Sequence, residues 1–316
     1  MSVVLAMTAR SLPESINLKS LLGRAPTPLD FVLPGFVRGT VGALVSPGGV
    51  GKSYWSLAAA VAIGAGSKAD LTGLKPAEGR VVLLSKEDPL PVLEQRLHEM
   101  AKVLPKSVSY AGVDYRSCLG LDIDIMNAGW FDAIVTAARG ARLVILDTLT
   151  RFHKLDENSA QDMGALLSQL ESLAAASGAS VLFLHHTSKA AVVNGQASLQ
   201  QAARGSSVLV DNARWSAFLA VMTEQEAKSI GVPAGERVQY VRWNISKQNY
   251  GPAIPDVWYR RNDGGVLVPV KFTPMRAAPA AEQPSVPVES KAGTPVPAVT
   301  EKHGSPSAKG AFDGNW

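Results

Sequence analysis

Short apolar runs and helical segments alternate between residues 41 and 186. Each run is nearly free of polar side chains, which predicts a strand buried on both faces of a sheet. The predicted strands span residues 41–46, 80–85, 142–147 and 180–186. The segments between them have apolar side chains at helical spacing, and the predicted helices span residues 52–66, 89–104, 130–139 and 160–178. This order predicts a parallel sheet with helices on both faces.

The pattern becomes strand-rich beyond Val208. We interpret the apolar and aromatic runs there as antiparallel strands added at one edge of the sheet. These runs span residues 214–222, 237–249, 257–261 and 265–270. The whole pattern predicts an α/β fold with a mostly parallel central sheet, helices on both faces and antiparallel edge strands.

The two ends of the chain differ from this central part. Residues 1–24 form a predicted N-terminal arm, in which residues 16–22 have the spacing of a short helix. Residues 277–316 are rich in Pro and Ala and have no apolar period. Because such a segment cannot bury enough apolar surface to fold, we predict a disordered tail. Residues 25–276 are then the predicted folded core, which prolines open with an extended stretch.

Cysteine content and charge narrow the function classes only slightly. Cys118 is the single cysteine of the chain, which excludes an internal disulfide and indicates a reducing compartment. We therefore expect a cytoplasmic protein, with Cys118 as a small buried side chain. No apolar run approaches the roughly 20 residues of a membrane span, so we expect no membrane partner. The net charge of +4 hints at an anionic partner.

Residues 46–53 read SPGGVGKS and match the phosphate-binding pattern G-x-x-x-x-G-K-[ST], except that Ser46 replaces the first glycine. The segment follows a predicted strand and opens a helix, where backbone N–H groups stabilise phosphate charge. Ser46 lies at the strand end, where a negative φ suffices. The sequence therefore predicts a site for ATP with Mg²⁺. The predicted ATP contacts are Pro47, Gly48, Gly49, Val50, Gly51, Lys52 and Ser53. Among them, Lys52 reaches the β- and γ-phosphates and the Ser53 hydroxyl binds Mg²⁺.

Carboxylates end two further predicted strands. Asp147 ends one of them, and an acid at this position holds Mg²⁺ in phosphate-loop ATPases. Glu87 and Asp88 follow another, where a carboxylate can orient and deprotonate the attacking water. We choose Glu87 as this base, because Asp88 precedes a proline and is expected to cap the next helix.

His185 and His186 end the last of the predicted parallel strands. A polar group at this position can contact the γ-phosphate and pass its loss to the following loop. Adjacent strand residues point to opposite faces, so one of the two is expected in the site, and the sequence leaves open which. No Cys or carboxylate cluster accompanies them, which argues against a zinc site.

Short stretches spread over nearly the whole predicted core carry a resemblance to a known family. They read PLDFVLP, GTVGALVSPGGVGKS, EDP, WFD, VILDTLTRFH, FLHHTSK, RGSSVLVDNARW, SKQNYG and RRNDGGVL, between Pro28 and Leu267. With them the chain resembles the RepA family of replicative helicases from broad-host-range IncQ plasmids, which are hexameric members of the RecA/DnaB-like ATPases. The phosphate loop of that family also begins with Ser, as Ser46 does here.

The resemblance implies a RecA-like ATPase core, six subunits in a ring and ATP at each subunit junction. It further implies single-stranded DNA threaded through the ring and movement from 5′ to 3′. By position, Lys52 and Ser53 bind phosphate and Mg²⁺, and Asp147 is the acid on the magnesium side. Glu87 is the catalytic base, and one of the two histidines is the γ-phosphate sensor. Since no primase or origin-binding module is recognisable, a plasmid primase and an origin-binding initiator are the expected partners.

The resemblance also implies cations that act on the ATP of a neighbouring subunit. SKQNYGP is similar to the KQRNGP of the wider DnaB group, but Asn249 stands where that group has Arg. Lys247 keeps its place and is expected near the neighbour's phosphates. Arg214 is then the expected arginine finger, with Arg204 as its rival.

Two loops are the expected DNA contacts of such a ring. Residues 188–203 form a long loop of small and polar residues that contains Lys189. The loop after Asp147 contains Arg151 and Lys154. Such cations grip phosphates without reading bases, so binding should be salt-sensitive and weakly dependent on DNA sequence.

Two other functions fit the same motifs. A strand-exchange or repair ATPase of the same fold would form filaments on DNA in place of closed rings. A regulatory or scaffold ATPase would bind no DNA, and its ATP turnover would be indifferent to single strands.

Overall fold

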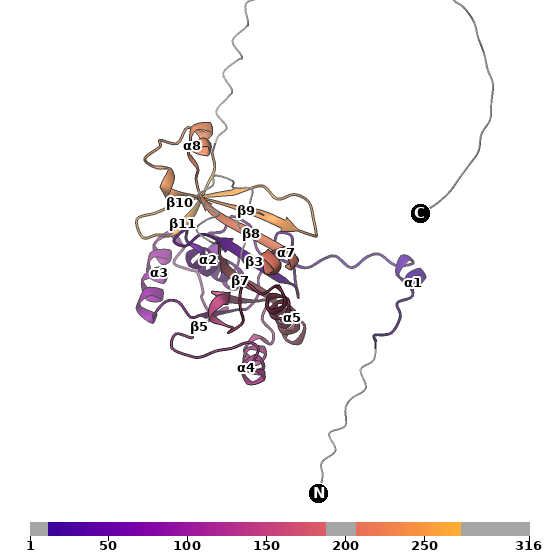
Figure 1. Ribbon diagram of the computed structural model, residues 1–316. Helices are drawn as coiled ribbons and strands as arrows, with labels where there is room; N and C mark the ends of the chain where they lie inside the picture. Colours follow the sequence, from indigo (N-terminus) through magenta and orange to yellow (C-terminus); the bar gives the residue numbers. More distant parts are fainter. Residues whose placement is uncertain (1–11, 188–206, 273–316) are drawn as a thin grey trace, which may run out of the picture. The chain divides into compact units, whose positions relative to one another are not determined.

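The computed structural model describes residues 12–187 and 207–272, which build one central sheet (Figure 1). Its strand order is β11-β10-β9-β8-β3-β7-β6-β4-β5. The strands are β3 (Val41–Ser46), β4 (Val81–Ser85), β5 (Val113–Ser117), β6 (Leu143–Asp147), β7 (Ser180–His186), β8 (Trp215–Val221), β9 (Tyr240–Gln248), β10 (Val257–Arg261) and β11 (Leu267–Val270). The chain divides into two units. The second, residues 276–316, contains the predicted tail and lies outside the described residues.

The sheet is parallel from β8 to β5 and antiparallel beyond β8. Parallel pairs join β3 to β7 and β8, β6 to β7 and β4, and β4 to β5. Antiparallel pairs join β8 to β9, β9 to β10, and β10 to β11. This confirms the predicted α/β architecture, but the antiparallel part begins one strand later than the pattern indicates. The 28 residues from Thr187 to Arg214, which include α7 (Ser207–Asn212), are long enough for the crossover that a parallel neighbour needs.

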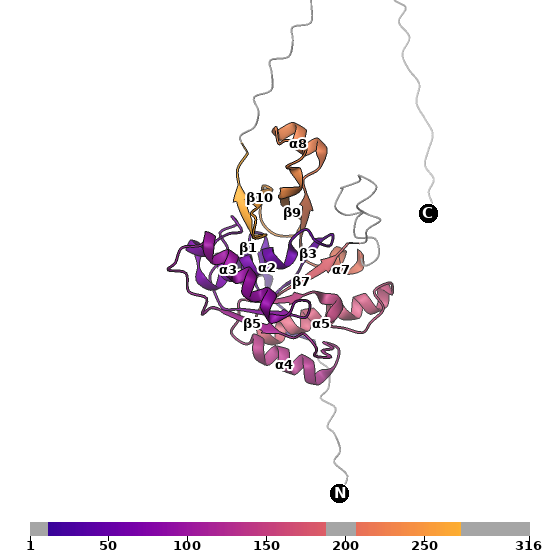
Figure 2. The ribbon, with the colours of Figure 1, turned by 90° about the vertical axis from the view of Figure 1, so that its left-hand side faces the viewer.

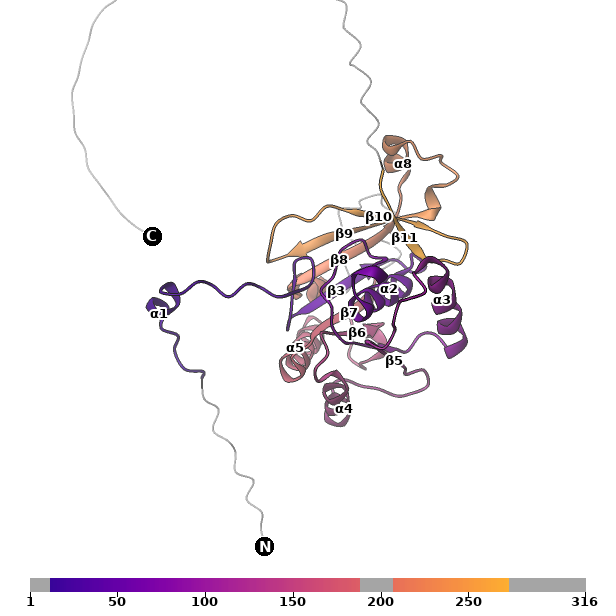
Figure 3. The same cartoon turned by 180° about the vertical axis from the view of Figure 1, so that it is seen from behind.

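Helices cover both faces of the sheet (Figures 2 and 3). One face packs against α2 (Lys52–Ala65) and α3 (Leu90–Val103), and the other against α4 (Ala128–Ala138), α5 (Ala160–Ser177) and α7. Successive strand residues point to opposite faces. In β4, for example, Leu83 packs into the cluster of α2 and α3, whereas Leu84 packs into the cluster of α4 and α5. Burial on both faces explains why the central strands are uniformly apolar.

Several short elements escape the sequence pattern. β5 reads VDYRS because it is an edge strand, paired only with β4 and partly exposed. β1 (Phe31–Leu33) and β2 (Phe36–Val37) form an antiparallel hairpin where the prolines predict only extended chain. α8 (Glu224–Ile230) begins with a capping box between Thr223 and Glu226. The described connections also contain the single-turn helices η1 (Ser67–Ala69), η2 (Leu149–Arg151) and η3 (Arg237–Gln239).

The predicted helix of the N-terminal arm is present as α1 (Leu18–Leu22). The Asn17 side chain caps it by accepting a hydrogen bond from the Ser20 N–H, and none of its residues is buried. Within the described ranges, no helix has both the length and the apolarity to cross a membrane.

Aromatic side chains fix the antiparallel strands against α2. Trp55 of α2 stacks on Trp243 of β9, with ring centroids 6.0 Å apart. The Trp55 indole N–H donates to the Tyr259 hydroxyl of β10 at 3.0 Å, and that hydroxyl donates to the backbone carbonyl of Thr72 at 2.6 Å. Because these groups are buried and paired, the β9–β11 extension is held in a defined position beside the first helix.

Candidate active site

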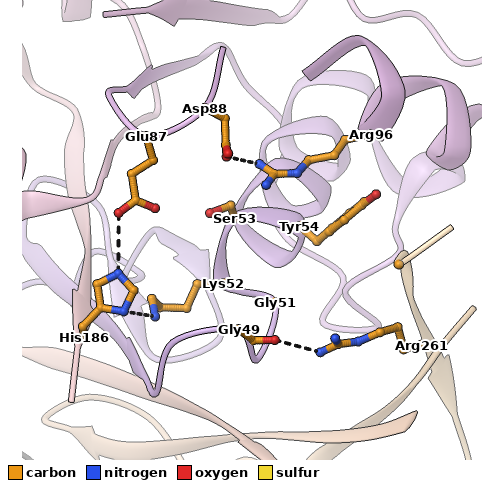
Figure 4. A pocket seen from close by; sticks show the side chains of 11 residues that line it. Gly49, Gly51, Lys52, Ser53, Tyr54, Glu87, Asp88, Arg96, His186 and Arg261 are labelled. Carbon is orange, nitrogen blue, oxygen red and sulfur yellow. Dashed lines mark hydrogen bonds and ion pairs between the residues drawn. The ribbon is translucent and has the colours of Figure 1, made fainter. Parts of the chain in front are cut away.

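The phosphate loop and the polar strand ends meet at one edge of the sheet. In the parallel register, Ser46 of β3 lies opposite His186 of β7, and Ser85 of β4 lies opposite Asp147 of β6. The loop turns with positive φ at Gly49 (78°) and Gly51 (114°), conformations that favour glycine, and α2 begins at once with Lys52. The loop thus has the strand–loop–helix context that the sequence predicts, with the helix N-terminus facing the cavity (Figure 4).

Lys52 is folded back into the loop. Its ammonium donates to the carbonyl of Ser46 at 3.0 Å and to that of Pro47 at 3.3 Å. It also lies 3.0 Å from Nδ1 of His186. Burial lowers the pKa of Lys52 to about 8, against the opposing influence of Asp147 and Glu87. A buried ammonium at this place is an anion-binding group.

Ser46 has a role that the motif alone does not suggest. Its buried hydroxyl accepts a hydrogen bond from the Lys52 ammonium at 3.0 Å and donates to the Pro47 carbonyl at 2.8 Å. A glycine could not make either contact. The departure from the phosphate-binding pattern therefore adds a partner for Lys52.

Glu87 follows β4 and lines the cavity opposite the loop. The Thr148 hydroxyl donates to its carboxylate at 2.9 Å, and Nε2 of His186 lies 3.5 Å from it. The hydrogen bond with His186 lowers the pKa of Glu87, and that with Thr148 acts in the same direction. The carboxylate is therefore ionised, which is the form that accepts a proton, and the same contacts make it a weaker base than an isolated glutamate.

Asp88 does not cap the following helix. Its carboxylate pairs with Arg96 at 2.6 Å, and the residue at the N-cap position of α3 is Pro89. Asp88 lies one residue before the N-cap, and its carboxylate is paired with an arginine further along α3. Glu87 remains the carboxylate that faces His186.

Asp147 is buried beside Ser53. Burial raises the pKa of Asp147 to about 6, the nearby Glu87 raises it further, and a hydrogen bond from the Ser53 side chain opposes the shift. Its Oδ1 atom is buried and has no hydrogen-bond partner in the described part of the chain. An orphaned carboxylate oxygen next to a hydroxyl fits a bound cation.

These donors fit Mg²⁺ better than a transition metal. Nowhere in the described ranges do three or more His, Cys, Asp or Glu side chains gather as a metal site. Mg²⁺ needs only one or two protein ligands when phosphate and water supply the rest. Ser53 and Asp147 would hold it.

The structure distinguishes the two histidines. His186 contacts both Lys52 and Glu87, so it lies in the site. His185 points to the opposite face and is only 5% exposed. Burial lowers the pKa of His185 to about 4, with Glu157 acting in the opposite direction. Of the two, His186 is therefore the one that lines the cavity together with the phosphate loop.

The cavity extends beyond the phosphate loop and the strand ends, to side chains that no motif of the sequence assigns to the site. Its volume is about 340 Å³, and its lining beyond the phosphate loop includes Tyr54, Arg96 and Arg261. The Arg96 guanidinium lies 5.3 Å from the Tyr54 ring centroid. Arg261 comes from β10, more than two hundred residues further along the chain, and belongs to the stretch RRNDGGVL, to which the sequence assigns no role in the site.

Arg214 and Lys247 lie at the other end of the sheet. Arg214 is exposed and immediately precedes β8, whose first residue pairs with Gly42 near the start of β3. Lys247 pairs with Ser216 of β8, and its ammonium donates to the Asp211 carbonyl. The length of β3, five steps of about 3.3 Å, separates these cations from the loop of their own chain by roughly 16 Å. Arg214 and Lys247 thus lie near each other, but away from the phosphate loop of their own chain.

The predicted DNA contacts are described only in part. Arg151 and Lys154 follow β6, both are exposed, and Lys154 pairs with Asp122 at 2.6 Å. Lys86 lies beside this loop, with its ammonium 5.7 Å from the centroid of the Phe152 ring. Lys189 and Arg204 lie outside the described residues.

Comparison with known proteins places this geometry in a family. Over residues 11–192, more than half of its length, the chain matches a family described as AAA domain.

Two solved structures share the fold. One is a structure of an ATPase domain, with 15% identity and a TM-score of 0.51 over 76% of this chain and 88% of that one. The other is a DnaB-like replicative helicase, solved to show its interactions with primase, with 14% identity and a TM-score of 0.51. In that case the match covers 74% of this chain and 58% of the other. The likeness extends to the RecA-like arrangement of a mostly parallel sheet with antiparallel edge strands. A family match of this extent, which includes the phosphate loop, means that the protein belongs to the AAA domain family of P-loop ATPases.

Proposed function

We propose that this ATPase is a replicative DNA helicase of a plasmid-type replicon, related to the RepA family. Its motor core is residues 25–276, and six copies form a ring that moves 5′ to 3′ on single-stranded DNA. The observation that carries the proposal is the convergence of Lys52, Ser53, Glu87, Asp147 and His186 at one sheet edge. The fold shared with DnaB-like helicase ATPase domains supports the choice of a DNA motor.

Within one subunit, each group around the loop has one task. The N–H groups of residues 48–53 and the Lys52 ammonium bind the β- and γ-phosphates. Ser53 and Asp147 hold Mg²⁺, which supplies charge neutralisation on the phosphate oxygens when it is bound. Glu87, kept ionised by His186 and Thr148, accepts the proton of the attacking water.

His186 links this chemistry to movement. It lies between Lys52 and Glu87 and is the last residue of β7, directly before the segment that contains Lys189. A change at the γ-phosphate alters the partners of His186 and hence the direction in which the chain leaves the strand. Lys189, Arg151 and Lys154 then move the DNA phosphates that they hold.

A neighbouring subunit completes the site. Arg214 and Lys247 lie at the sheet end remote from their own loop, which supports a role at the loop of another copy. A head-to-tail ring gives each loop the cations of the next subunit. Such a trans arginine accounts for about 10³–10⁵ in turnover in related phosphoryl transfer. A primase and an origin-binding initiator supply the steps that this chain does not perform.

ATP hydrolysis measured with and without single-stranded DNA, combined with the mass of the assembly, tests the proposal. The helicase predicts salt-sensitive stimulation by DNA and a mass of six subunits. Filaments of variable mass would favour a strand-exchange ATPase, and turnover indifferent to DNA would favour a regulatory ATPase. Either outcome would replace the proposed function.

A further inference from the structure

The guanidinium of Arg261, which belongs to β10 in the antiparallel part of the sheet, binds backbone carbonyls of the phosphate loop. Nη2 of Arg261 donates to the backbone carbonyl of Val50 at 2.6 Å. It also reaches the carbonyl of Gly49 at 3.4 Å (Figure 4). Neither carbonyl belongs to a helix or strand ladder, since α2 begins only at Lys52. Arg261 is thus a partner for loop carbonyls that the loop's own fold leaves available.

Because the peptide bond is planar, this contact also fixes the N–H groups of the loop. In a trans peptide, the C=O of one residue points opposite to the N–H of the next. Fixing the Gly49 carbonyl therefore orients the Val50 N–H, and fixing the Val50 carbonyl orients the Gly51 N–H. These are donors that a phosphate-binding loop directs at its ligand. The positive charge of the guanidinium beside the carbonyls also polarises the two peptide groups and strengthens both N–H donors.

The strand that carries Arg261 is held firmly against the loop. The turn between β10 and β11 is closed by the Asn262 side chain, which accepts from the Val266 N–H at 2.8 Å. The Tyr54 hydroxyl, next to Ser53, donates to the Gly264 carbonyl at 2.6 Å. Leu267 lies so near the loop that a Cβ at Gly51 would approach its Cδ1 to 3.2 Å. These contacts hold β10 and the turn after it beside the loop, so the Arg261 guanidinium stays close to the loop carbonyls.

We propose that Arg261 is a positioning residue, which holds the phosphate-binding N–H groups of Val50 and Gly51 in their binding orientation through the carbonyls of Gly49 and Val50. This inference rests on the proposed function in one respect, namely that the loop binds nucleotide phosphates. It also ties the loop to the β9–β11 extension, whose first strand carries Lys247.

Ligand affinity in matched variants tests the proposal. In the full chain, Arg261→Ala should weaken the binding of ADP and of inorganic tripolyphosphate by the same factor, roughly ten- to hundredfold, the value of one charge-assisted hydrogen bond. Arg261→Lys should fall between this variant and the wild type. The control is Arg260→Ala, because Arg260 is the next residue on β10 but lies over the Tyr240 ring on the opposite face. It should bind both ligands as the wild type does.

Rescue and kinetics separate this role from a merely structural one, and the comparison of ADP with tripolyphosphate separates it from a direct contact between Arg261 and the adenine base. Millimolar guanidinium should restore tripolyphosphate binding to Arg261→Ala and should not affect Arg260→Ala. In ATP hydrolysis, Arg261→Ala should raise KM by the same ten- to hundredfold, while kcat at saturation stays within a few-fold. Weaker ADP binding with unchanged tripolyphosphate binding would overturn the proposal in favour of a contact between Arg261 and the adenine base. Unchanged binding of both ligands, or no rescue, would overturn it as well. If the wild type bound neither ligand, the proposed nucleotide site itself would be wrong.

Discussion

Replacing His185 by glutamine should remove an acid sensitivity of folding and leave the chemistry of the site in place. His185 is buried on the face away from the phosphate loop, near Glu157 and His153, and burial lowers its pKa to about 4. In the unfolded chain its pKa returns to about 6.5. The unfolded state therefore binds more protons between these two values, so the free energy of unfolding falls as the pH drops from about 6.5 to about 4. At about pH 4.5, this loss amounts to about 2.5 kcal/mol relative to about pH 7.5.

The assay is urea unfolding of both proteins at about pH 7.5 and about pH 4.5. The stability lost on acidification should be smaller by about 2.5 kcal/mol in His185→Gln than in the wild type. Only this difference is informative, because the raised pKa of Asp147 adds stability in the acid range of both proteins. His186→Gln is the matched control and should keep the acid loss but impair ATP hydrolysis. Equal acid losses in wild type and His185→Gln would refute the assignment of His185 as the buried, neutral member of the pair.

Three further substitutions test separate parts of the account. Lys52→Ala should abolish nucleotide binding and duplex unwinding; unwinding by this variant in the presence of ATP would contradict the role of the loop. Glu87→Gln should lower kcat by about 10²–10⁴ and leave ADP affinity unchanged, and a wild-type rate would exclude it as the base. Tyr259→Phe leaves the buried Trp55 indole N–H and Thr72 carbonyl without partners, so urea unfolding should show a loss of about 2–4 kcal/mol. A loss below about 0.5 kcal/mol would mean that these bonds do not stabilise the extension.

The parallel core could be predicted from the sequence because its strands are buried on both faces. Residues 41–46 and 180–186 are apolar for that reason and coincide with β3 and β7. The direction of β8 could not be predicted, since an apolar run gives no sign of which neighbour it pairs with. β5 could not be predicted either, because the partly exposed edge strand VDYRS has neither strict alternation nor a continuous apolar run.

The residues of the candidate site could likewise be predicted only in part. Lys52, Glu87, Asp147 and His186 come from motifs at strand ends, and parallel strands bring such ends together. The choice between His185 and His186 needed the register of β7 against β3, which the sequence does not contain. Arg261 could not be predicted, because its contact with Val50 depends on how the antiparallel extension folds back beside α2.

Mixing two inactive variants tests most directly whether the catalytic site is shared between copies. Lys52→Ala keeps the Arg214 finger, and Arg214→Ala keeps the loop and should bind ATP without hydrolysing it. Assembled alone, each should be inactive. Assembled together in equal amounts, they should form junctions with an intact loop and an intact finger and recover up to about one quarter of the wild-type hydrolysis rate. No recovery in the mixture, or wild-type turnover by Arg214→Ala alone, would contradict a site completed by the neighbouring subunit.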